Sequence, residues 1–299
     1  MFTWVKSDAI INYYFKMDRL TIEKEFICFS ASPNNVNWFN IALIASIFRL
    51  LVKIDWKKKY CCSRGNVFVW EIIITTGSLH SLSLIGDALI NPKDEVVIEN
   101  PTYPHAFSLF SSLKAKIFSV QIDSQGIIVS KIKAKKPKFI YTTPSNQYPT
   151  GVKMSLNRRV EVLNWVSDKN ALIIEDDYNH EFSNWENPIS AMYSLDNQDR
   201  VIYLGTFNKL LHPSIRLGYM IVPRYLVDTV TSLYEQSHRF VAPSQQKVLS
   251  DFIEKDFLNK HLRKVLEVSR ERKKIFIDTF NSYFENDILL DVKNPGMHI

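Results

Sequence analysis

A lysine and an arginine seven residues apart follow an apolar stretch in the second half of the chain. Val201–Leu204 is an apolar run typical of a buried parallel strand, and it breaks at Gly205 into a polar turn that contains Lys209. Burial at a strand end is expected to lower the pKa of an ammonium group, so that the neutral amine can attack a carbonyl carbon. Arg216 adds a planar cation suited to a phosphate group. An aldehyde for the lysine and a phosphate for the arginine together suggest pyridoxal 5′-phosphate, and the alternative is an unrelated pair of surface cations.

A glycine-containing turn earlier in the chain is a candidate anion site. It follows a predicted strand at 72–75 and contains Gly77, Ser78 and Leu79 before a predicted helix at 81–90. Glycine permits close approach of the backbone, and the exposed amides of a helix N-terminus attract negative charge. A plain strand-to-helix cap would have the same sequence pattern.

Two further turns are bounded by prolines. The predicted strand at 94–99 ends in a turn where two prolines flank Tyr103, and this tyrosine could stack on a flat cofactor ring or simply anchor the loop. The predicted strand at 139–142 runs into a second such turn at 143–151. Both turns are expected at the carboxyl ends of strands, which is where open α/β sheets bind ligands.

Two adjacent carboxylates follow another predicted strand, at 171–175. Asp176 and Asp177 repel each other unless a cation lies near one of them, and a protonated pyridine nitrogen is such a cation. A metal ion bound with the help of His180 is a second explanation, although hard cations need more oxygen ligands and zinc needs three or four donors. A solvated acidic loop is the third.

The elements that must position these residues alternate between strand and helix. The alternation repeats four or five times between Ile72 and Val222, which predicts an α/β domain with a largely parallel sheet. Amphipathic patterns then predict helices at 226–235, 243–253 and 257–280. A helical pattern at 38–51 and a strand-like stretch at 287–291 lie outside the alternating region.

The composition is that of a globular protein. Of the 299 residues, 46% are hydrophobic and 23% are charged, with a net charge of +6. The 37 Lys and Arg residues are scattered among 31 acidic residues, which favours solvated surfaces over a nucleic-acid groove. The apolar run at 41–54 contains two cations and is too short to span a bilayer. Three cysteines without zinc or disulfide spacing, and no signal-peptide pattern, predict a cytoplasmic protein.

Five motifs, in their order along the chain, resemble the class I/II aminotransferases of PLP fold type I. They are especially similar to the aminotransferase-like domain of the MocR branch of GntR-type bacterial regulators. The resemblance covers about residues 64–299, and its motifs are Thr75–His80, Glu99–Tyr103, Thr143–Gly151, Ile173–Tyr178 and Gly205–Tyr219. It implies a mostly parallel central sheet flanked by helices. The implied domains are an N-terminal segment at 1–64, a large cofactor-binding domain at 65–225, and the incomplete start of a small C-terminal α/β domain at 226–299.

The resemblance also implies roles for individual residues. Lys209 would form a Schiff base with pyridoxal 5′-phosphate. Asp176 would keep the pyridine nitrogen protonated, with Asp177 as the alternative. Tyr178 would donate a hydrogen bond to the ring hydroxyl, and Tyr103 would stack on the ring. The phosphate would be bound by backbone amides and side chains of Gly77, Ser78, Leu79, Thr206, Asn208 and Arg216.

Three positions depart from the family pattern. Asn208 replaces the usual serine, which weakens one expected phosphate contact. Tyr148 precedes Pro-Thr-Gly where aminotransferases carry an asparagine that reaches the ring hydroxyl, so Tyr178 is expected to bind that hydroxyl alone. His105 occupies a position where the regulator branch can carry an arginine for the substrate carboxylate, and a histidine there would be a weaker, pH-dependent clamp.

Three functions are compatible with the resemblance. The first is transfer of amino groups between an amino acid and a 2-oxo acid, and the second is non-catalytic sensing of an amino acid or amine as the effector domain of a MocR-type regulator. The third is a truncated inactive relative, because the winged-helix module is not found and the sequence ends before the arginine that binds the substrate α-carboxylate. A homodimer is the expected assembly, and neither nucleic acid, membrane nor metal is an expected partner of this chain alone.

Overall fold

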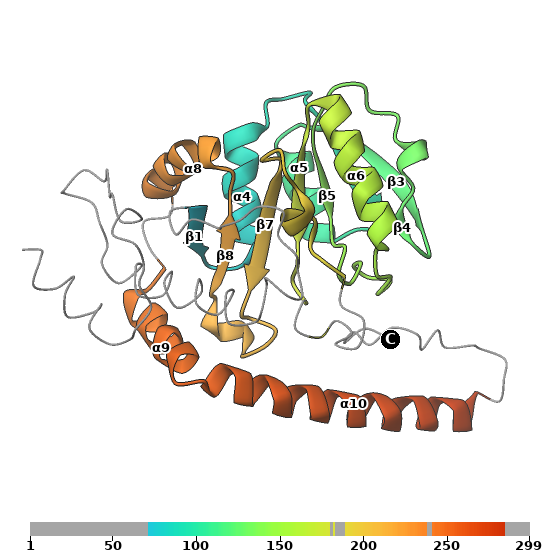
Figure 1. Ribbon diagram of the computed structural model, residues 1–299, viewed down its shortest axis with the longest axis vertical. Coiled ribbons are helices and arrows are strands. Elements are labelled where there is room, and N and C mark those ends of the chain that lie inside the picture. The colour runs from blue at the N-terminus through green and yellow to red at the C-terminus, as the bar shows by residue number, and fades with distance from the viewer. Residues whose placement is uncertain (1–70, 180–181, 183–188, 238–240, 285–299) are drawn as a thin grey trace, which may run out of the picture. The chain divides into compact units, whose positions relative to one another are not determined.

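The computed structural model describes residues 71–179, 182, 189–237 and 241–284, and its centre is a twisted sheet (Figure 1). All of these residues belong to one unit, Trp38–Ile299. The sheet has eight strands in the order β1-β8-β7-β6-β5-β2-β3-β4. Their bounds are Ile72–Thr75 (β1), Glu95–Asn100 (β2), Lys116–Asp123 (β3), Gly126–Ile127 (β4), Pro137–Thr142 (β5), Leu172–Asp176 (β6), Val201–Thr206 (β7) and Gly218–Ile221 (β8).

The predicted mostly parallel α/β sheet is confirmed. Strands β3, β2, β5, β6 and β7 pair in parallel, whereas β8 runs antiparallel to both of its neighbours, β7 and β1. A parallel return needs a long crossover, and residues 207–217 contain only the short 3-10 helix η5 (Pro213–Ile215), so the chain reverses directly into β8. The carboxyl ends of β1, β5, β6 and β7 therefore lie at the same edge of the sheet.

Helices cover both faces of the sheet. They are α4 (Ser78–Leu89), α5 (Pro104–Ser112), α6 (Leu156–Lys169), α7 (Met192–Leu195), α8 (Arg224–Ser237), α9 (Pro243–Glu254) and α10 (Phe257–Tyr283), with a 3-10 turn η3 at Val129–Lys131. Residues of α4, α5 and α8 share one apolar cluster with Ile174 of β6. Residues of α6, α7, α9 and α10 share the other cluster with Ile173, because successive strand side chains point to opposite faces.

Helix α4 begins three residues earlier than its predicted start at 81. Gly77 is the residue before the helix and has φ of +119°, a conformation that side chains rarely adopt. Ser78 and Leu79 therefore belong to the first turn of the helix. This difference matters for the site, because the amides of a first helical turn have no partners within the helix.

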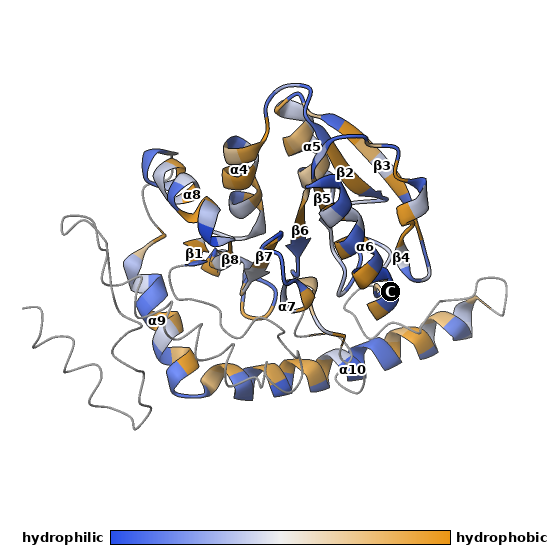
Figure 2. Ribbon diagram, turned by 45° about the horizontal axis from the view of Figure 1, so that its top comes forward, coloured by the Kyte–Doolittle hydropathy of each residue, from blue (hydrophilic) through white to orange (hydrophobic). Residues whose placement is uncertain are grey.

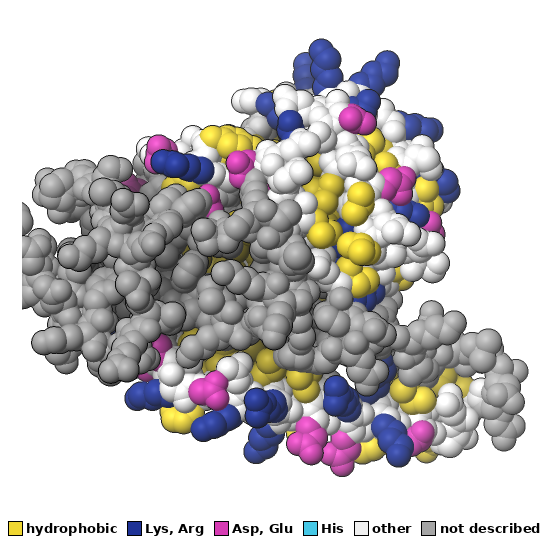
Figure 3. Space-filling model, viewed as in Figure 1, with side chains coloured by type: hydrophobic (Ala, Val, Ile, Leu, Met, Phe, Trp, Pro, Cys, Tyr) yellow, Lys and Arg dark blue, Asp and Glu magenta, His cyan; other side chains and the backbone are white. Residues whose placement is uncertain are grey.

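Helix α10 is buried mainly in its first turns. Leu258 and Leu262 are buried in the same cluster as α9, and the later residues are mostly exposed. Apolar and hydrophilic residues alternate along this helix (Figure 2), and its surface carries both acidic and basic side chains (Figure 3). The predicted helix at 38–51, the predicted strand at 287–291 and the predicted domain boundary at 64 lie outside the described residues. Within the described ranges, no helix is long and apolar enough to cross a membrane.

Candidate active site

Lys209 lies in the turn between β7 and β8, at the carboxyl edge of the sheet. Buried Phe207 and Leu210 flank it, and the amide of Leu211 closes the turn by donating to the Phe207 carbonyl over 2.9 Å. The lysine side chain is exposed overall, but its Nζ lies 4.6 Å from the centre of the Tyr178 ring. Desolvation by these surroundings lowers the pKa of Lys209, and the charge of Asp176 partly opposes this. A lowered pKa makes the neutral, nucleophilic amine easier to reach than in a fully solvated lysine.

Asp176 ends β6 and is only 3% exposed. Tyr141, on the neighbouring strand β5, donates a hydrogen bond of 2.9 Å to its Oδ2. Its other oxygen, Oδ1, is buried and has no hydrogen-bond partner among the described residues. Desolvation raises the pKa of Asp176 to about 6, although hydrogen bonds from Tyr141 and Ser78 and the charge of Lys209 act in the opposite direction. A cationic hydrogen-bond donor at Oδ1 would offset the desolvation of the ionised carboxylate.

Asp177 lies on the other face of the sheet from Asp176. It accepts a hydrogen bond of 3.0 Å from Tyr203, which belongs to the apolar cluster beneath α6. On the same face, Glu175 lies 3.5 Å from Arg159, and both side chains are fully buried. The two adjacent aspartates that the sequence left as alternatives are therefore separated by the pleat of the strand. The charge of Asp176 acts on Lys209.

The glycine-containing turn packs directly against the lysine turn. A Cβ atom at Gly77 would lie 2.8 Å from Asn208 Nδ2 and 4.0 Å from Thr206 Oγ1. The amide of Asn208 donates to Thr206 Oγ1 over 3.3 Å, and Asn208 Oδ1 accepts from the amide of Leu217 over 3.0 Å. Asn208 thus spans the β7–β8 turn in the place of the expected serine. Among the described residues, no side chain caps the N-terminus of α4.

The other predicted phosphate-site residues differ in exposure. Ser78 is half-buried and Leu79 is 41% exposed, so both first-turn residues are accessible from solvent. Arg216 is exposed, follows η5, and adopts a left-handed conformation with φ of +50°. Burial raises the pKa of the Tyr103 phenol and the charge of Arg216 partly opposes this rise, which places the guanidinium near the aromatic side of the site.

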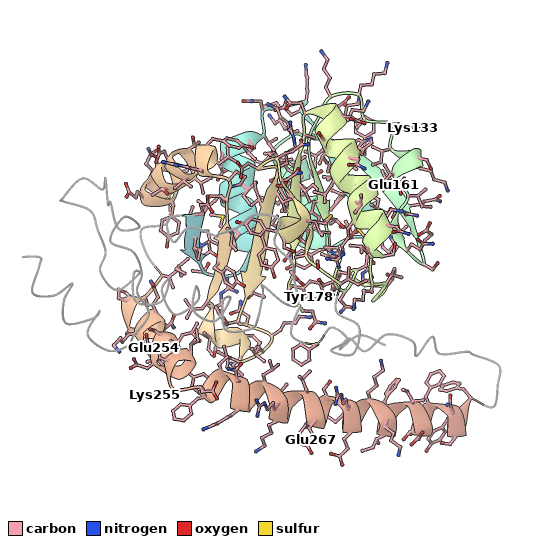
Figure 4. The ribbon with its side chains drawn as sticks, in the orientation of Figure 1. Lys133, Glu161, Tyr178, Glu254, Lys255 and Glu267 are labelled. Atoms are coloured by element: carbon pink, nitrogen blue, oxygen red, sulfur yellow. The ribbon has the colours of Figure 1, made fainter. Side chains whose placement is uncertain are left out.

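Three tyrosines and a histidine line this edge of the sheet. The ring of Tyr103 meets the ring of Tyr148 edge-on at 5.5 Å, and Tyr148 meets Tyr178 at 6.1 Å (Tyr178 is labelled in Figure 4). His105 is exposed and contacts Tyr103 edge-on at 5.2 Å. Burial raises the pKa of Tyr103 and of Tyr178, with the Asp176 charge as the next cause for both. Both phenols therefore stay protonated and can act as hydrogen-bond donors.

Two residues of this edge were missed by the sequence reasoning, Tyr141 and Asn146. Tyr141 points toward Asp176 from the adjacent strand, a relation that only the strand order reveals. Asn146 Nδ2 lies 3.4 Å from the Tyr178 hydroxyl, so an amide accompanies Tyr178 even though Tyr148 occupies the expected asparagine position. The signal available in the sequence was its place in the proline-bounded turn after β5.

A buried carboxylate holds that turn in place. Glu99, which is 1% exposed, accepts hydrogen bonds from the side chains of Thr142 and Thr143 and from Gln147 Nε2. Gln147 Nε2 also donates to the carbonyls of Pro101 and Tyr148, each over 2.7 Å. The two proline-bounded turns are thus tied to each other. Within the described ranges, no group of three or more metal-binding side chains is present.

The comparisons with known proteins agree with this geometry. A family model described as aminotransferase class I and II matches residues 69–284. The chain is 33% identical to an uncharacterised HTH-type transcriptional regulator, YdeL, of Bacillus subtilis over 77% of this chain and 49% of that protein. It is 30% identical to the probable rhizopine catabolism regulatory protein MocR of Rhizobium meliloti, over 77% of this chain and 46% of that protein. The chain thus spans about half the length of these curated relatives.

Solved structures extend the similarity to enzymes. The crystal structure of kynurenine aminotransferase from Pyrococcus horikoshii, in complex with PMP, is 29% identical with a TM-score of 0.73, over 85% of this chain and 63% of that one. An archaeal alanine:glyoxylate aminotransferase has a TM-score of 0.75 at 27% identity, over 97% of this chain and 69% of that one. The resemblance predicted from the five motifs is confirmed, and the chain belongs to the class I and II aminotransferase family.

Proposed function

We propose that this chain binds pyridoxal 5′-phosphate covalently through Lys209 and transfers amino groups between an amino acid and a 2-oxo acid, as a cytoplasmic homodimer. The observation that carries the proposal is the pair formed by Lys209 and Asp176 at one edge of the sheet. The lysine has a lowered pKa, and the aspartate presents a buried oxygen that lacks a hydrogen-bond partner within the part of the chain that the structure describes. A pyridine ring with an aldehyde and a protonated nitrogen would satisfy both groups.

The residues present fit the cofactor ring. Asp176 Oδ1 would accept a hydrogen bond from the pyridinium, and Asp177 is committed to Tyr203 on the opposite face. Tyr178 would donate to the ring hydroxyl with Asn146 beside it, and Tyr103 would lie against the ring. The bound cofactor supplies an electron sink that stabilises negative charge at the substrate Cα. Lys209 would carry the Cα proton as general base.

The residues also fit a phosphate group. The first turn of α4 offers the amides of Ser78 and Leu79 beside Thr206, and the φ of +119° at Gly77 is strained for any other residue type. Arg216 would add the cation. Asn208 Oδ1 is occupied by the Leu217 amide, so only its Nδ2 could face a phosphate oxygen. His105, at the exposed rim beside Tyr103, would bind the carboxylate of the incoming amino acid or amine.

A titration with pyridoxal 5′-phosphate tests the proposal. The purified wild-type chain should develop a visible absorbance band with saturable affinity, and Lys209→Ala should not. Lys153→Ala is a matched control, because burial also lowers the pKa of Lys153 but its charged neighbours are Arg159 and Asp177. Addition of single amino acids should then convert the band and release one equivalent of 2-oxo acid. Equal bands in the wild-type chain and Lys209→Ala would refute the proposal.

The second candidate function is effector sensing without turnover. It is favoured by the two regulators of which this chain matches about half. In that case an amino acid or amine would change the absorbance band at saturation, but no 2-oxo acid would accumulate. A chain that fails to retain the cofactor at all would instead be an inactive relative.

A further inference from the structure

His80 links the glycine-containing turn to a helix outside the candidate site. It is the third residue of α4, and its Nδ1 accepts a hydrogen bond from the backbone amide of Thr76 over 3.1 Å. The Thr76 hydroxyl also lies 3.1 Å from the same nitrogen. A side chain in the third helical position that reaches back to an amide before the helix fixes the entry of the chain into that helix. Here the fixed residue directly precedes Gly77.

The imidazole ring is itself held from the other side. It stacks on the ring of Tyr234 in α8, with centroids 5.6 Å apart and an interplanar angle of 20°. Tyr234 is 9% exposed, and its hydroxyl accepts a hydrogen bond of 3.3 Å from the amide of Val241. Since both the stack and the acceptor position are defined, His80 can hold Thr76 in one place.

The turn that His80 holds has little room for displacement. A Cβ atom at Gly218 would lie 2.8 Å from Gly77 Cα, and one at Gly77 would lie 2.8 Å from Asn208 Nδ2. The Thr75 hydroxyl also contacts Ser81 Oγ at 2.8 Å, which ties β1 to the second turn of α4. A shift of Thr76 would therefore move the first-turn amides relative to Thr206 and Asn208.

We propose that His80 is a positioning residue for the phosphate group of the cofactor. It does not touch the phosphate, and it acts by keeping the Thr76–Gly77 turn in the conformation that aims the amides of Ser78 and Leu79 at one point. This inference rests on the proposed function. It predicts a contribution to the binding of phosphate-bearing ligands and none to the binding of the ring or aldehyde.

Two variants separate the hydrogen bond from the stack. His80→Phe keeps an aromatic ring for Tyr234 but removes the acceptor, and His80→Asn keeps an acceptor at the position of Nδ1 but removes the ring. Dissociation constants for pyridoxal 5′-phosphate and for pyridoxal, which lacks the phosphate, would be measured on the full chain. Inorganic phosphate would be used as a competitor, and thermal unfolding would be recorded for each variant.

His80→Phe should weaken the binding of pyridoxal 5′-phosphate and of inorganic phosphate by about tenfold and leave the binding of pyridoxal unchanged. This is the loss expected when one hydrogen bond is removed and a backbone amide is left unpaired. His80→Asn should stay within about threefold of wild type for all three ligands. If His80→Phe does not fold, His80→Ala replaces it with the same expectation. If a folded His80→Phe or His80→Ala variant still prefers pyridoxal 5′-phosphate over pyridoxal by the same factor as wild type, the inference is overturned. If the wild-type chain itself binds pyridoxal and its phosphate ester equally, the proposed cofactor site fails instead.

Discussion

At the scale of single residues, the chemistry of the site depends on which face of β6 a carboxylate occupies. Asp176 and Asp177 are neighbours in sequence, but one accepts from Tyr141 and the other from Tyr203 on opposite sides of the sheet. The charge of Asp176 acts on Lys209, and Asp176 presents a buried oxygen, Oδ1, that has no hydrogen-bond partner among the described residues. The pKa of about 6 for Asp176 reflects that uncompensated burial.

Replacement of either aspartate by asparagine should separate their roles. Asp176→Asn should weaken pyridoxal 5′-phosphate by about 10- to 100-fold, because a charge-assisted hydrogen bond to the ring nitrogen would be lost. Asp177→Asn should leave the dissociation constant within about threefold of wild type, since its Oδ2 partner Tyr203 lies on the far face. Fluorescence titration of both variants checks this. Equal losses of affinity in the two variants would show that the assignment of the ring nitrogen to Asp176 is wrong.

The raised pKa of Asp176 also predicts a pH dependence of stability without cofactor. The folded carboxyl binds a proton more readily than the unfolded one, so its stabilising contribution is complete below pH 4 and is lost as the pH rises through about 6. The shift from 3.8 to about 6 corresponds to about 3 kcal/mol. Chemical unfolding measured at pH 5 and at pH 8 gives the free energy of unfolding at each pH. Its decrease from pH 5 to pH 8 should be smaller for Asp176→Asn than for wild type. An identical decrease in both proteins would contradict the assigned burial cost.

Part of the residue-scale account could be predicted from the sequence, and part could not. Lys209 and Asp176 were identified because both types follow apolar runs, and local sequence carries that signal. Tyr141 and Asn146 were not, because their importance comes from pairing between β5 and β6 and from the folding of one turn back toward Tyr178. Contacts between strands distant in sequence have no local signature.

At the scale of elements, the turn that carries Lys209 is supported by α10. His261 Nε2 lies 2.9 Å from the carbonyl oxygen of Leu210, the residue after the lysine. Leu258 and Leu262 of the same helix pack in one cluster with Leu210. The start of α10 thus contacts and supports the turn that carries Lys209.

Removal of this support should weaken cofactor binding. His261→Ala should raise the dissociation constant of pyridoxal 5′-phosphate about fivefold, the value of one ordinary hydrogen bond, and His261→Gln should restore most of the loss because its amide nitrogen can occupy the position of Nε2. Lys260→Ala, on the exposed side next to Phe257, is the control. Wild-type affinity in His261→Ala would show that the helix does not support the turn.

The meeting point of β1, β7 and β8 leaves no space for a side chain. A Cβ atom at Gly218 would lie 2.8 Å from the Gly205 carbonyl oxygen and 2.8 Å from Gly77 Cα, both backbone atoms that cannot move aside. Gly218→Ala should reduce the free energy of unfolding by about 1–3 kcal/mol and should also weaken phosphate binding. Gly86→Ala is a matched control, because its Cβ would meet the ends of the Leu113 and Ile90 side chains and no backbone atom among those nearest to it. Similar stabilities of the two variants, measured by chemical denaturation, would argue against this close packing.

Element prediction succeeded where hydrophobic patterns were clear. The strand at 72–75 and the helices beginning at 243 and 257 match the observed starts. Strand β8 was not singled out, since Gly218–Ile221 is short and reads as a continuation of the motif that contains Arg216. The early start of α4 depends on the φ angle of Gly77, which no apolar pattern encodes.

At the scale of the whole molecule, the described unit contains the edge of the sheet on which the proposed chemistry depends. The family model ends at residue 284, and the chain spans about half of each curated regulator that it matches. The residues of the proposed cofactor site therefore all lie within this unit. The dimeric state rests on analogy with the fold.

The most direct test of the account is reductive trapping of the cofactor followed by peptide mapping. The full chain would be mixed with pyridoxal 5′-phosphate, reduced with borohydride, digested and analysed by mass spectrometry. The account predicts a stable pyridoxyl-phosphate adduct on Lys209 at close to one equivalent per chain, and none on Lys153. A label spread over surface lysines, or a stoichiometric adduct on any lysine other than Lys209, would contradict it.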